Sequence, residues 1–464
     1  MATHIWTGGG VGGSASTILN WDTGSAPTTG DIVIYDGAFP VTGTKNCTWD
    51  IDGAVNLNSL TISSGYTGTI TNLTRFQVTN AAPKTITFDG GVWNWGGGII
   101  HLTGVLDASQ NATKTITCSN STIICNSSCL LDGVGLTFNK NTGTVQFGGD
   151  GFMATTAGVT LNNFTPSASV VLKNDVTVTG TLLLNSAIVN SFNLISQGDV
   201  SGGGSSQVST GTTGIQFQGG SNQTLTGNNE VIQFDTTINK SAGTLTLAGT
   251  IRTGFTRSST WTYTAGTVDP GTSILKPIGG TTTLNLSGMS LFDLDITGGT
   301  AVATSTLDIN GAINIAGTFE PGANTVNVAG NWTKTGTFTR ATSTINFDGT
   351  STLVGNTSFN ALTFTASSVN LASSANFVAA STFTANGGGA SNLIVLSATT
   401  AGQRAIFRVS GGQAVSFVSA TDMDSSGGNT VSNASGTTSN TINWTIPAPV
   451  IPATDTLSYI FMVA

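Results

Sequence analysis

Charged residues are scarce in this sequence. Only 8% of its 464 residues are Asp, Glu, Lys or Arg, and the formal net charge is -8. The 14 Lys and Arg residues are scattered, whereas a nucleic-acid surface needs clustered basic side chains to neutralise phosphates. We therefore expect no nucleic-acid partner. Disorder is not expected either, because 38% of the residues are hydrophobic and disordered chains lack apolar residues.

Long apolar runs, a secretory leader and a dense cysteine framework are also missing. No run of 18 apolar residues occurs, so we expect no membrane insertion. The start, MATHIWTGGGVGG, does not have the pattern of a signal peptide, which predicts assembly in the cytoplasm. Four cysteines are too few to stabilise a chain of this length through disulfide bonds.

Short alternating triplets are what the sequence does contain, and they are clearest between residues 305 and 350. Each triplet places two apolar side chains on one face and a polar one on the other, as in a half-buried strand. Examples are Leu307-Asp308-Ile309, Ile313-Asn314-Ile315, Val326-Asn327-Val328 and Ile345-Asn346-Phe347. Such short strands are stable only when copies stack to bury a continuous core.

A longer signature, Thr-apolar-x-Phe-x-Gly and looser forms of it, recurs along the chain. Its apolar residue falls at positions 86, 145, 215, 274 and 345, so the intervals alternate regularly between a shorter and a longer one. At about 20 residues per turn, one such interval would hold roughly three turns of a solenoid.

Strands that stack at this interval without hairpin turns must run parallel. The sequence therefore predicts an all-β protein, a right-handed parallel β-helix or β-solenoid with an N-terminal cap and a C-terminal tail. We divide it into a cap or docking segment (1–50), repeats (51–402), a closing coil (403–446) and a proline-containing tail (447–464). Asparagines at triplet centres could stack into amide ladders or simply face solvent: Asn285, Asn314, Asn327 and Asn346.

The first 50 residues differ from the rest in their tryptophans and turn residues. An open first edge of a stacked sheet would invite polymerisation, and an aromatic segment with Gly and Pro turns is a sensible plug. The residues assigned to this cap and to docking are Trp6, Trp21, Pro27 and Asp31.

These motifs together resemble the Gly- and Thr-rich parallel β-helix proteins of phage virions and bacterial surfaces. The opening pattern around Trp6, Gly30 and Asp31, the internal stretch 326–332 and the closing stretch 414–444 carry the resemblance. A resemblance between repeats indicates the fold of a protein far better than its role. Bacterial members of the family usually carry export and anchoring segments, so the absence of both here favours a phage virion protein.

Acidic pairs are the first candidates for chemistry. Asp422 and Asp424, and likewise Asp293 and Asp295, are spaced to share one face of a strand and could act on a glycosidic bond. The alternative is that they cap turns, and with only two glutamates in the chain we expect no catalytic residues and no enzyme.

Cysteines and aromatic residues give two further candidates. Cys118, Cys125 and Cys129 lack metal-site spacing, so we predict buried thiols stacked in successive coils, no metal and no cofactor. Trp93 and Trp95 share a face beside glycines and could form a stacking platform for a sugar; otherwise they cover coils or a subunit contact.

The sequence thus favours a structural phage virion protein, a fibre, spike or decoration element located in the virion. Expected partners are other virion proteins, identical subunits with a trimer as one arrangement, and a host surface glycan. The first alternative is an extracellular bacterial adhesin or filament subunit at the cell surface. The second is a polysaccharide-degrading tailspike.

Overall fold

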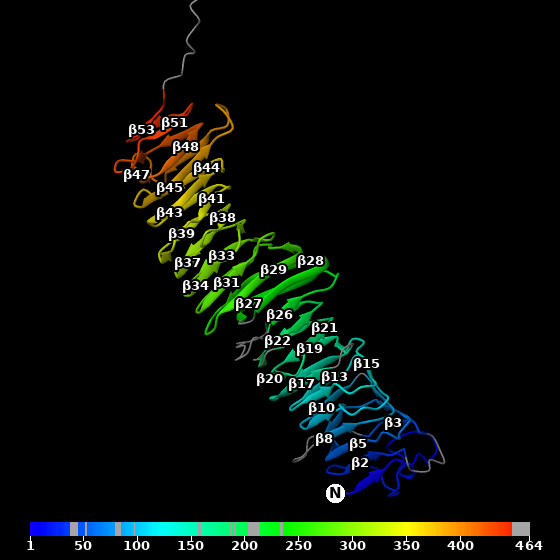
Figure 1. Cartoon of the computed structure of the whole chain (residues 1–464). Helices are drawn as coiled ribbons and strands as arrows, with labels where there is room; N and C mark the ends of the chain where they lie inside the picture. The colour runs from blue at the N-terminus through cyan, green and yellow to red at the C-terminus, as the bar shows by residue number, and fades with distance from the viewer. Residues whose placement is uncertain are drawn as a thin grey trace, which may run out of the picture. The chain divides into compact units, whose positions relative to one another are not determined.

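The protein is built almost entirely of short β-strands. The computed structural model describes residues 1–37, 45–51, 53–78, 85–96, 98–155, 159–185, 188–189, 192–202, 214–232 and 235–447. Within these ranges the single helical element is the 3-10 turn η1 (Ile18–Asn20). The strands stack as parallel coils, which confirms the predicted β-solenoid (Figure 1).

The predicted alternation of apolar and polar residues produces these strands. In β21 (Val176–Val178) both valines are fully buried and Thr177 between them is half-exposed. The same buried, half-buried, buried pattern occurs in β36 (Ile313–Ile315). Burial of one face of each strand is therefore the main force that holds a coil together.

The chain divides into two compact units, Met1–Asp308 and Ile309–Ala464. From β2 (Ile32–Tyr35) to β16 (Thr144–Phe147), successive strands of the first unit belong in turn to three sheets, so that three strands complete one coil; beyond β16, consecutive strands can lie in the same sheet. The first sheet contains β1 (Thr3–Ile5), β2 (Ile32–Tyr35), β5 (Ser59–Ile62), β8 (Thr85–Phe88), β11 (Val105–Asp107), β14 (Cys129–Leu131), β17 (Gly151–Thr155), β20 (Val170–Leu172) and β23 (Ile188–Val189). The second contains β3 (Cys47–Trp49), β6 (Thr69–Asn72), β9 (Val92–Trp95), β12 (Lys114–Cys118) and β15 (Leu136–Asn139).

The third sheet of this unit begins with β4 (Asn56–Leu57), β7 (Phe76–Val78), β10 (Ile99–Leu102), β13 (Thr122–Cys125) and β16 (Thr144–Phe147). Its later strands are β18 (Thr160–Leu161), β19 (Asn163–Pro166), β21, β22 (Leu182–Leu184), β24 (Leu194–Ser196), β25 (Val200–Gly202), β26 (Gly214–Phe217), β27 (Gln223–Ile232), β28 (Asp235–Thr253), β29 (Ser259–Asp269), β30 (Ile274–Pro277), β31 (Thr281–Asn285), β33 (Asp293–Ile296) and β34 (Thr300–Ala303). Two further strands are β32 (Ser290–Leu291) and β35 (Leu307–Ile309).

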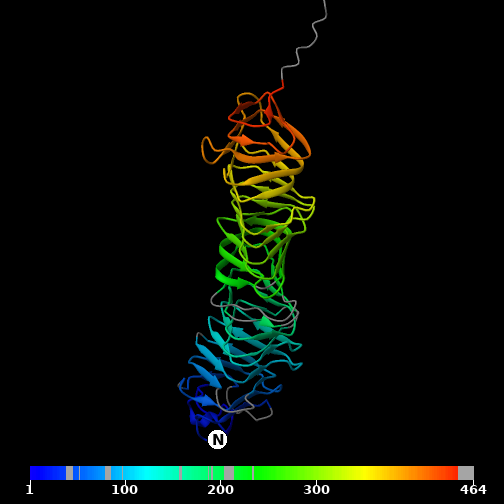
Figure 2. The same cartoon turned by 90° about the vertical axis from the view of Figure 1, so that its left-hand side faces the viewer.

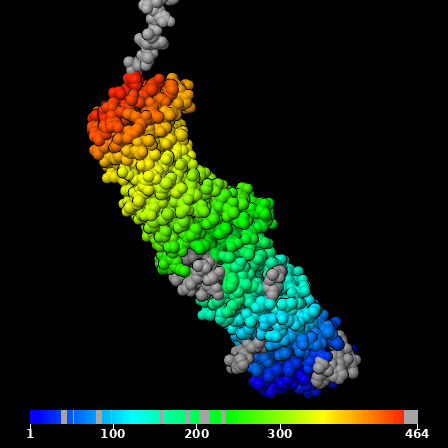
Figure 3. All heavy atoms as spheres, viewed as in Figure 1, coloured from blue at the N-terminus to red at the C-terminus, as the bar shows by residue number. Residues whose placement is uncertain are grey.

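The second unit has the same construction. Its strands are β36, β37 (Thr318–Glu320), β38 (Thr325–Val328), β39 (Trp332–Lys334), β40 (Thr337–Phe338), β41 (Thr344–Phe347), β42 (Ser351–Val354), β43 (Thr357–Phe364), β44 (Ser368–Leu371), β45 (Asn376–Asn386), β46 (Ile394–Ala398), β47 (Ala405–Val409), β48 (Gly412–Ser416), β49 (Val418–Thr421), β50 (Met423–Asp424), β51 (Val431–Ala434), β52 (Thr437–Ser439) and β53 (Trp444–Thr445). In both units the strands lie across the direction of stacking (Figure 2), and successive coils are in direct contact (Figure 3).

Coil length varies around the predicted value of about 20 residues. Ile86 pairs with Leu106, and in the second unit Val326 pairs with Ile345, so these coils agree with the prediction. Leu60 pairs with Ile86, which makes the coil between them longer.

The longer recurring signature does not correspond to one structural unit. Ile86 lies in the first sheet and Val145 in the third. Ile215 in β26 and Ile274 in β30 pair with different parts of β28. A strand has the same alternation on every face of a solenoid, so the signature marks strands without marking a particular face.

The core contains contacting aromatic rings in both units. Trp49, Phe76, Trp93 and Trp95 form a chain of edge contacts in the first unit, with centroid distances of 5.0 to 5.9 Å. Glycines allow coils to approach closely at corners: a Cβ on Gly37 would lie 1.8 Å from the backbone of Gly65.

One of the expected asparagine ladders is present. Asn346 Nδ2 donates to Asn327 Oδ1 at 3.2 Å between β38 and β41. Asn285 instead pairs in register with Thr262, and Asn314 with Thr333.

No helix among the described residues is both long enough and apolar enough to cross a membrane.

Candidate functional site

The N-terminal segment between β1 and β2 folds over the first coil. It covers the outer edge of β1, because Ile5 N–H donates to Asp22 Oδ1 at 2.7 Å and Asp22 N–H donates to Ile5 O at 3.0 Å. A side-chain carboxylate thus satisfies a backbone donor that would otherwise be open to strand addition.

The same segment covers the first strands of the other two sheets. Ala15 N–H donates to Thr48 O at 2.9 Å, and Thr48 N–H donates to Gly13 O at 2.6 Å, so that residues 13–15 pair along β3. Gly30 N–H donates to Asn56 O at 2.8 Å at β4. All three faces of the first coil are therefore closed by residues 6–31, which we call the N-terminal cap.

Aromatic side chains fill the interior under this cap. Trp21 packs edge-on against Trp6 at 5.1 Å, and its Nε1 donates to Ala15 O at 2.7 Å. Trp6 and Trp21 are 1% and 3% exposed, and Pro27 and Asp31 are buried too. The four residues assigned to capping and docking therefore lie inside the cap, and their side chains are not available as docking groups. Docking by this segment stays a prediction.

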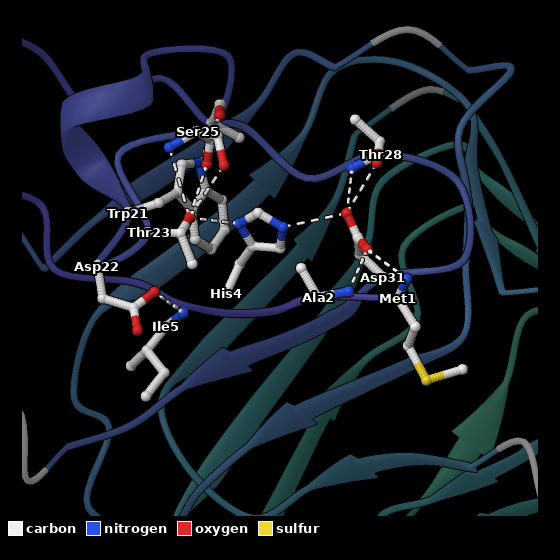
Figure 4. Close-up of polar contacts among 11 residues, drawn as sticks. Met1, Ala2, His4, Ile5, Trp21, Asp22, Thr23, Ser25, Thr28 and Asp31 are labelled. Atoms are coloured by element: carbon white, nitrogen blue, oxygen red, sulfur yellow. Dashed lines mark hydrogen bonds and ion pairs between the residues drawn. The ribbon is translucent and has the colours of Figure 1, made fainter.

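A buried histidine and aspartate link β1 to the turn that precedes β2 (Figure 4). His4 is 2% exposed and lies between two partners: its Nε2 is 3.0 Å from Asp31 Oδ2, and its Nδ1 is 2.8 Å from Thr23 Oγ1. Asp31 also accepts from Ala2 N–H at 2.6 Å and from Thr28 N–H at 3.0 Å and Thr28 Oγ1 at 2.8 Å. Both carboxylate oxygens of Asp31 therefore have hydrogen-bond partners.

These contacts set the charge state of Asp31. Burial by itself would raise the pKa of this carboxyl, but the hydrogen bonds from Ala2, Thr28 and His4 outweigh burial and lower the pKa to about 2. The carboxylate is ionised at neutral pH and anchors the chain start.

The order hydroxyl, imidazole, carboxylate also occurs in hydrolase triads. Here Thr23 Oγ1 contacts Ser25 O and Ser25 Oγ as well, both at 3.2 Å. The network fastens three segments of the cap, and we assign it a positioning role. Sequence reasoning selected Asp31 and missed His4, although a histidine at an inward position of an alternating start was a usable signal.

A buried lysine is the second site that sequence reasoning missed. Lys114 is 1% exposed, and its Nζ donates to Gln110 O at 2.7 Å and lies 3.7 Å from Asp89 Oδ1. Burial lowers the pKa of Lys114 and raises that of Asp89. A polar hollow beside the pair is lined by Ser64, Asp89, Ser109, Gln110, Asn111 and Ala112. The signal was a lysine at the inward position of Lys114-Thr115-Ile116-Thr117-Cys118.

The two tryptophans proposed to bind a glycan lie in the core. Trp93 and Trp95 share one face of β9, as predicted, but that face points inward and both side chains are 0% exposed. Trp93 Nε1 donates to Asn72 Oδ1 at 2.5 Å inside the stack. The predicted sugar platform is therefore wrong, because the rings pack against each other at 5.7 Å and against Phe76.

Asp422 and Asp424 do not form the expected pair on one strand face. Asp422 occupies a corner between β49 and β50 with φ of 58°, and it accepts hydrogen bonds from Asn440 Nδ2 and from Gly402 N–H. Asp424 accepts from Ser426 N–H at 2.8 Å. The hydrogen bond from Asn440, foremost, lowers the pKa of the Asp422 carboxyl, and hydrogen bonds from Ser426, that of its side chain foremost, lower the pKa of Asp424. A glycosidase proton donor needs a raised pKa.

Asp293 and Asp295 do share the outward face of β33. Asp295 Oδ2 forms an ion pair with Lys276 Nζ at 2.7 Å. A partly exposed pair of this kind neutralises the surface and contributes little to stability.

The cysteines are free and buried. Cys118, Cys125 and Cys129 occupy β12, β13 and β14, the three consecutive strands of one coil, so they converge within a coil rather than stacking in successive coils. Burial raises the pKa of Cys118, and the hydrogen bond that the Cys125 thiol donates to Cys129, together with burial, raises the pKa of Cys125. In the part of the chain that is described, no cluster of His, Cys, Asp and Glu suits a metal ion.

No protein-family model, no curated protein and no solved structure matches this chain.

Proposed function

We propose that the chain is a non-enzymatic structural component of a phage particle: a fibre, spike or decoration element. Its partners would be other virion proteins and identical subunits, with a host surface glycan as the target of adhesion, and it would assemble in the host cytoplasm. The phage assignment depends on the sequence resemblance alone.

The observation that carries a structural role is the N-terminal cap. It closes all three faces of the first coil with backbone and carboxylate hydrogen bonds and covers the end of the core with Trp6 and Trp21. Stacked coils with a closed end supply a stiff, bounded element in which each coil supports the next.

The alternatives are weaker for specific reasons. A filament that grows head to tail needs an open first edge, and the cap occupies that edge. A depolymerising tailspike needs a carboxylic acid with a raised pKa beside a carboxylate, and the pKa values of Asp422 and Asp424 are both lowered. An adhesin at a bacterial surface remains a candidate, because its requirements for fold are the same.

Sedimentation equilibrium with negative-stain imaging of the purified chain tests the proposal. A closed oligomer or a monomer of fixed size, together with no release of reducing sugar from polysaccharide substrates, is the expected result. Filaments that lengthen with concentration, or sugar release that Asp422→Asn abolishes, would overturn it. A glycan array then tests adhesion separately.

A further inference from the structure

The corner between the first and second sheets of the first unit contains a notch. The connection from β8 to β9, residues 89–91, is shorter than the equivalent connections of the coils on either side, residues 63–68 and 108–113. It also lies close to the preceding coil, because a Cβ on Gly90 would be only 2.4 Å from Ser63 O. A short loop between two longer loops leaves a hollow of about 370 Å³. Its lining residues are Ser64, Asp89, Ser109, Gln110, Asn111 and Ala112.

Asp89 brings a carboxyl group with unused acceptor capacity to this hollow. Its Oδ1 is buried and lies 3.7 Å from Lys114 Nζ, which is too far for a hydrogen bond. The side chain keeps 21% of its surface exposed. Buried carboxylates in proteins are normally hydrogen-bonded, so this group is suited to accept hydrogen bonds from a ligand.

The wall above Asp89 is held in place by contacts that leave a donor free for a ligand. Lys114 Nζ donates to Gln110 O at 2.7 Å and so anchors the loop 108–113 from inside. Asn111 Oδ1 accepts from Val134 N–H at 3.3 Å, which fixes the amide and leaves its Nδ2 as the donor. The hollow therefore combines a carboxylate, an amide donor and serine hydroxyls on a fixed frame.

The charges around the hollow favour a neutral ligand over an acidic one. Three carboxyl groups, those of Asp89, Asp107 and Asp132, stabilise the charged form of the single buried Lys114. The corner is therefore acidic, and it repels anions. Sugar hydroxyls suit such a lining because each can donate to a carboxylate and accept from an amide.

We propose that this hollow binds a neutral, hydroxyl-rich sugar residue, whose hydroxyl groups donate to the Asp89 carboxylate and accept from the Asn111 amide. Lys114 is a positioning residue, since it holds the wall through Gln110 without reaching the ligand. The inference rests on the glycan-adhesion part of the proposed function. It adds the place of binding and the exclusion of acidic sugars.

Saturation-transfer NMR of the full chain tests the proposal with methyl glycosides as probes. The neutral probes are methyl glucoside and methyl galactoside, and the acidic probe is the methyl glycoside of N-acetylneuraminic acid. We expect a neutral probe to bind at least about tenfold more tightly than the acidic one, because the acidic probe would place its carboxylate beside unpaired acceptors.

Two variants locate the binding site. Ser64→Trp fills the hollow from the exposed loop 63–68 and leaves the Lys114–Asp89 ion pair intact, whereas Asp89→Asn removes the charged acceptor. We expect each to weaken binding of the neutral probe about tenfold or more. Thr67→Trp is the matched control, since Thr67 is exposed on the same loop and does not line the hollow. Thermal denaturation checks that the variants are folded, and Ser64→Trp decides if Asp89→Asn is not.

The outcomes separate this inference from the proposed function. Neutral-probe binding that is unchanged in Ser64→Trp would overturn the site, as would the absence of binding by either neutral probe. Equal binding of the acidic probe would overturn the argument from charge. A glycan array of the natural chain tests adhesion itself: a glycan bound equally by the natural chain and by Ser64→Trp sinks the inference alone, and an array without any bound glycan sinks adhesion as well.

Discussion

The two ends of the described chain differ in what they provide at the open edge of the sheets. At the N-terminal end the chain folds residues 6–31 across all three faces of the first coil. At the C-terminal end several corners have positive φ instead, at Phe417, Asp422, Ser435, Asn440 and Asn443. Its interior also becomes polar, since buried Asn433 exchanges hydrogen bonds with the backbone of Val418.

The difference shows that a stack needs two separate terminations, one for the backbone edges and one for the core. The N-terminal cap provides both, with hydrogen bonds for the edges and Trp21 for the core. The C-terminal end provides only the second among the described residues, through Trp444.

The largest effect should come from removing the core cover at the closed end. Trp21→Ala deletes contacts with Trp6 and Tyr35 and the hydrogen bond to Ala15, and a buried Trp→Ala change typically costs about 3–5 kcal/mol. Since coils contribute to stability locally, we expect faster hydrogen exchange in β1, β2 and β3 with no change in β47.

Trp444→Ala is the matched variant at the other end. Its ring stacks on Phe407 and its Nε1 has no acceptor among the described residues, so we expect a smaller loss than for Trp21→Ala. If thermal denaturation showed equal losses of stability in Trp21→Ala and Trp444→Ala, the contrast between the two ends would be removed.

Asp31→Asn should have the next largest effect. The change removes the charge that accepts hydrogen bonds from Ala2, Thr28 and His4, and disrupting a buried charged acceptor costs about 1–3 kcal/mol. Asp22→Asn is the control, because one amide oxygen can still accept from Ile5. Comparable destabilisation by both variants, measured by hydrogen exchange of β1, would argue against the buried network.

Acid should loosen the cap through the same carboxylate. The pKa of Asp31 is about 2 in the folded chain against an ordinary value of 3.8. A lowered pKa means that its stabilising contribution is complete above about pH 4 and is lost as the pH falls towards about 2. Tryptophan fluorescence followed over this range should change less in Asp31→Asn than in the natural chain. If Asp31→Asn and the natural chain showed the same change of fluorescence with acid, ionised Asp31 would not be what holds the cap.

The smallest perturbation is the labelling of a thiol, whose rate reports how often the coil around that thiol opens without changing the stability of the protein. Cys47 in β3 lies beside the cap, and burial raises its pKa to about 12. In the native chain we expect negligible labelling at pH 8. In Trp21→Ala, Cys47 should react about tenfold faster or more while Cys118 stays protected, because opening is local. Equal acceleration of the two thiols would instead indicate global unfolding.

The sequence predicts the fold well because alternation and coil length are local properties. Val326-Asn327-Val328 needs only its own pattern to become a strand, and the parallel stacking follows from repetition. The same locality explains the failure at Trp93 and Trp95. Alternation places them on one face, but whether that face points inward depends on neighbouring coils.

The sites were less predictable because they depend on contacts distant in sequence or on unusual backbone. His4 meets Asp31, far along the sequence, only after the cap has folded. Asp422 leaves the strand pattern because its φ is positive, a conformation that spacing does not reveal. Lys114 could have been found from the sequence more readily than His4 or Asp422, since its inward position follows from alternation alone.

The cap also has a consequence for synthesis on the ribosome. Among the described residues, its backbone contacts with the first coil reach as far as Asn58, whose N–H donates to Asp31 O. The closed end can therefore form once the first part of the chain has emerged. At translation rates of about 5–20 residues per second, the remaining coils would follow over tens of seconds. Throughout that time only the newest coil exposes an edge, and the cap gives the growing stack a fixed direction.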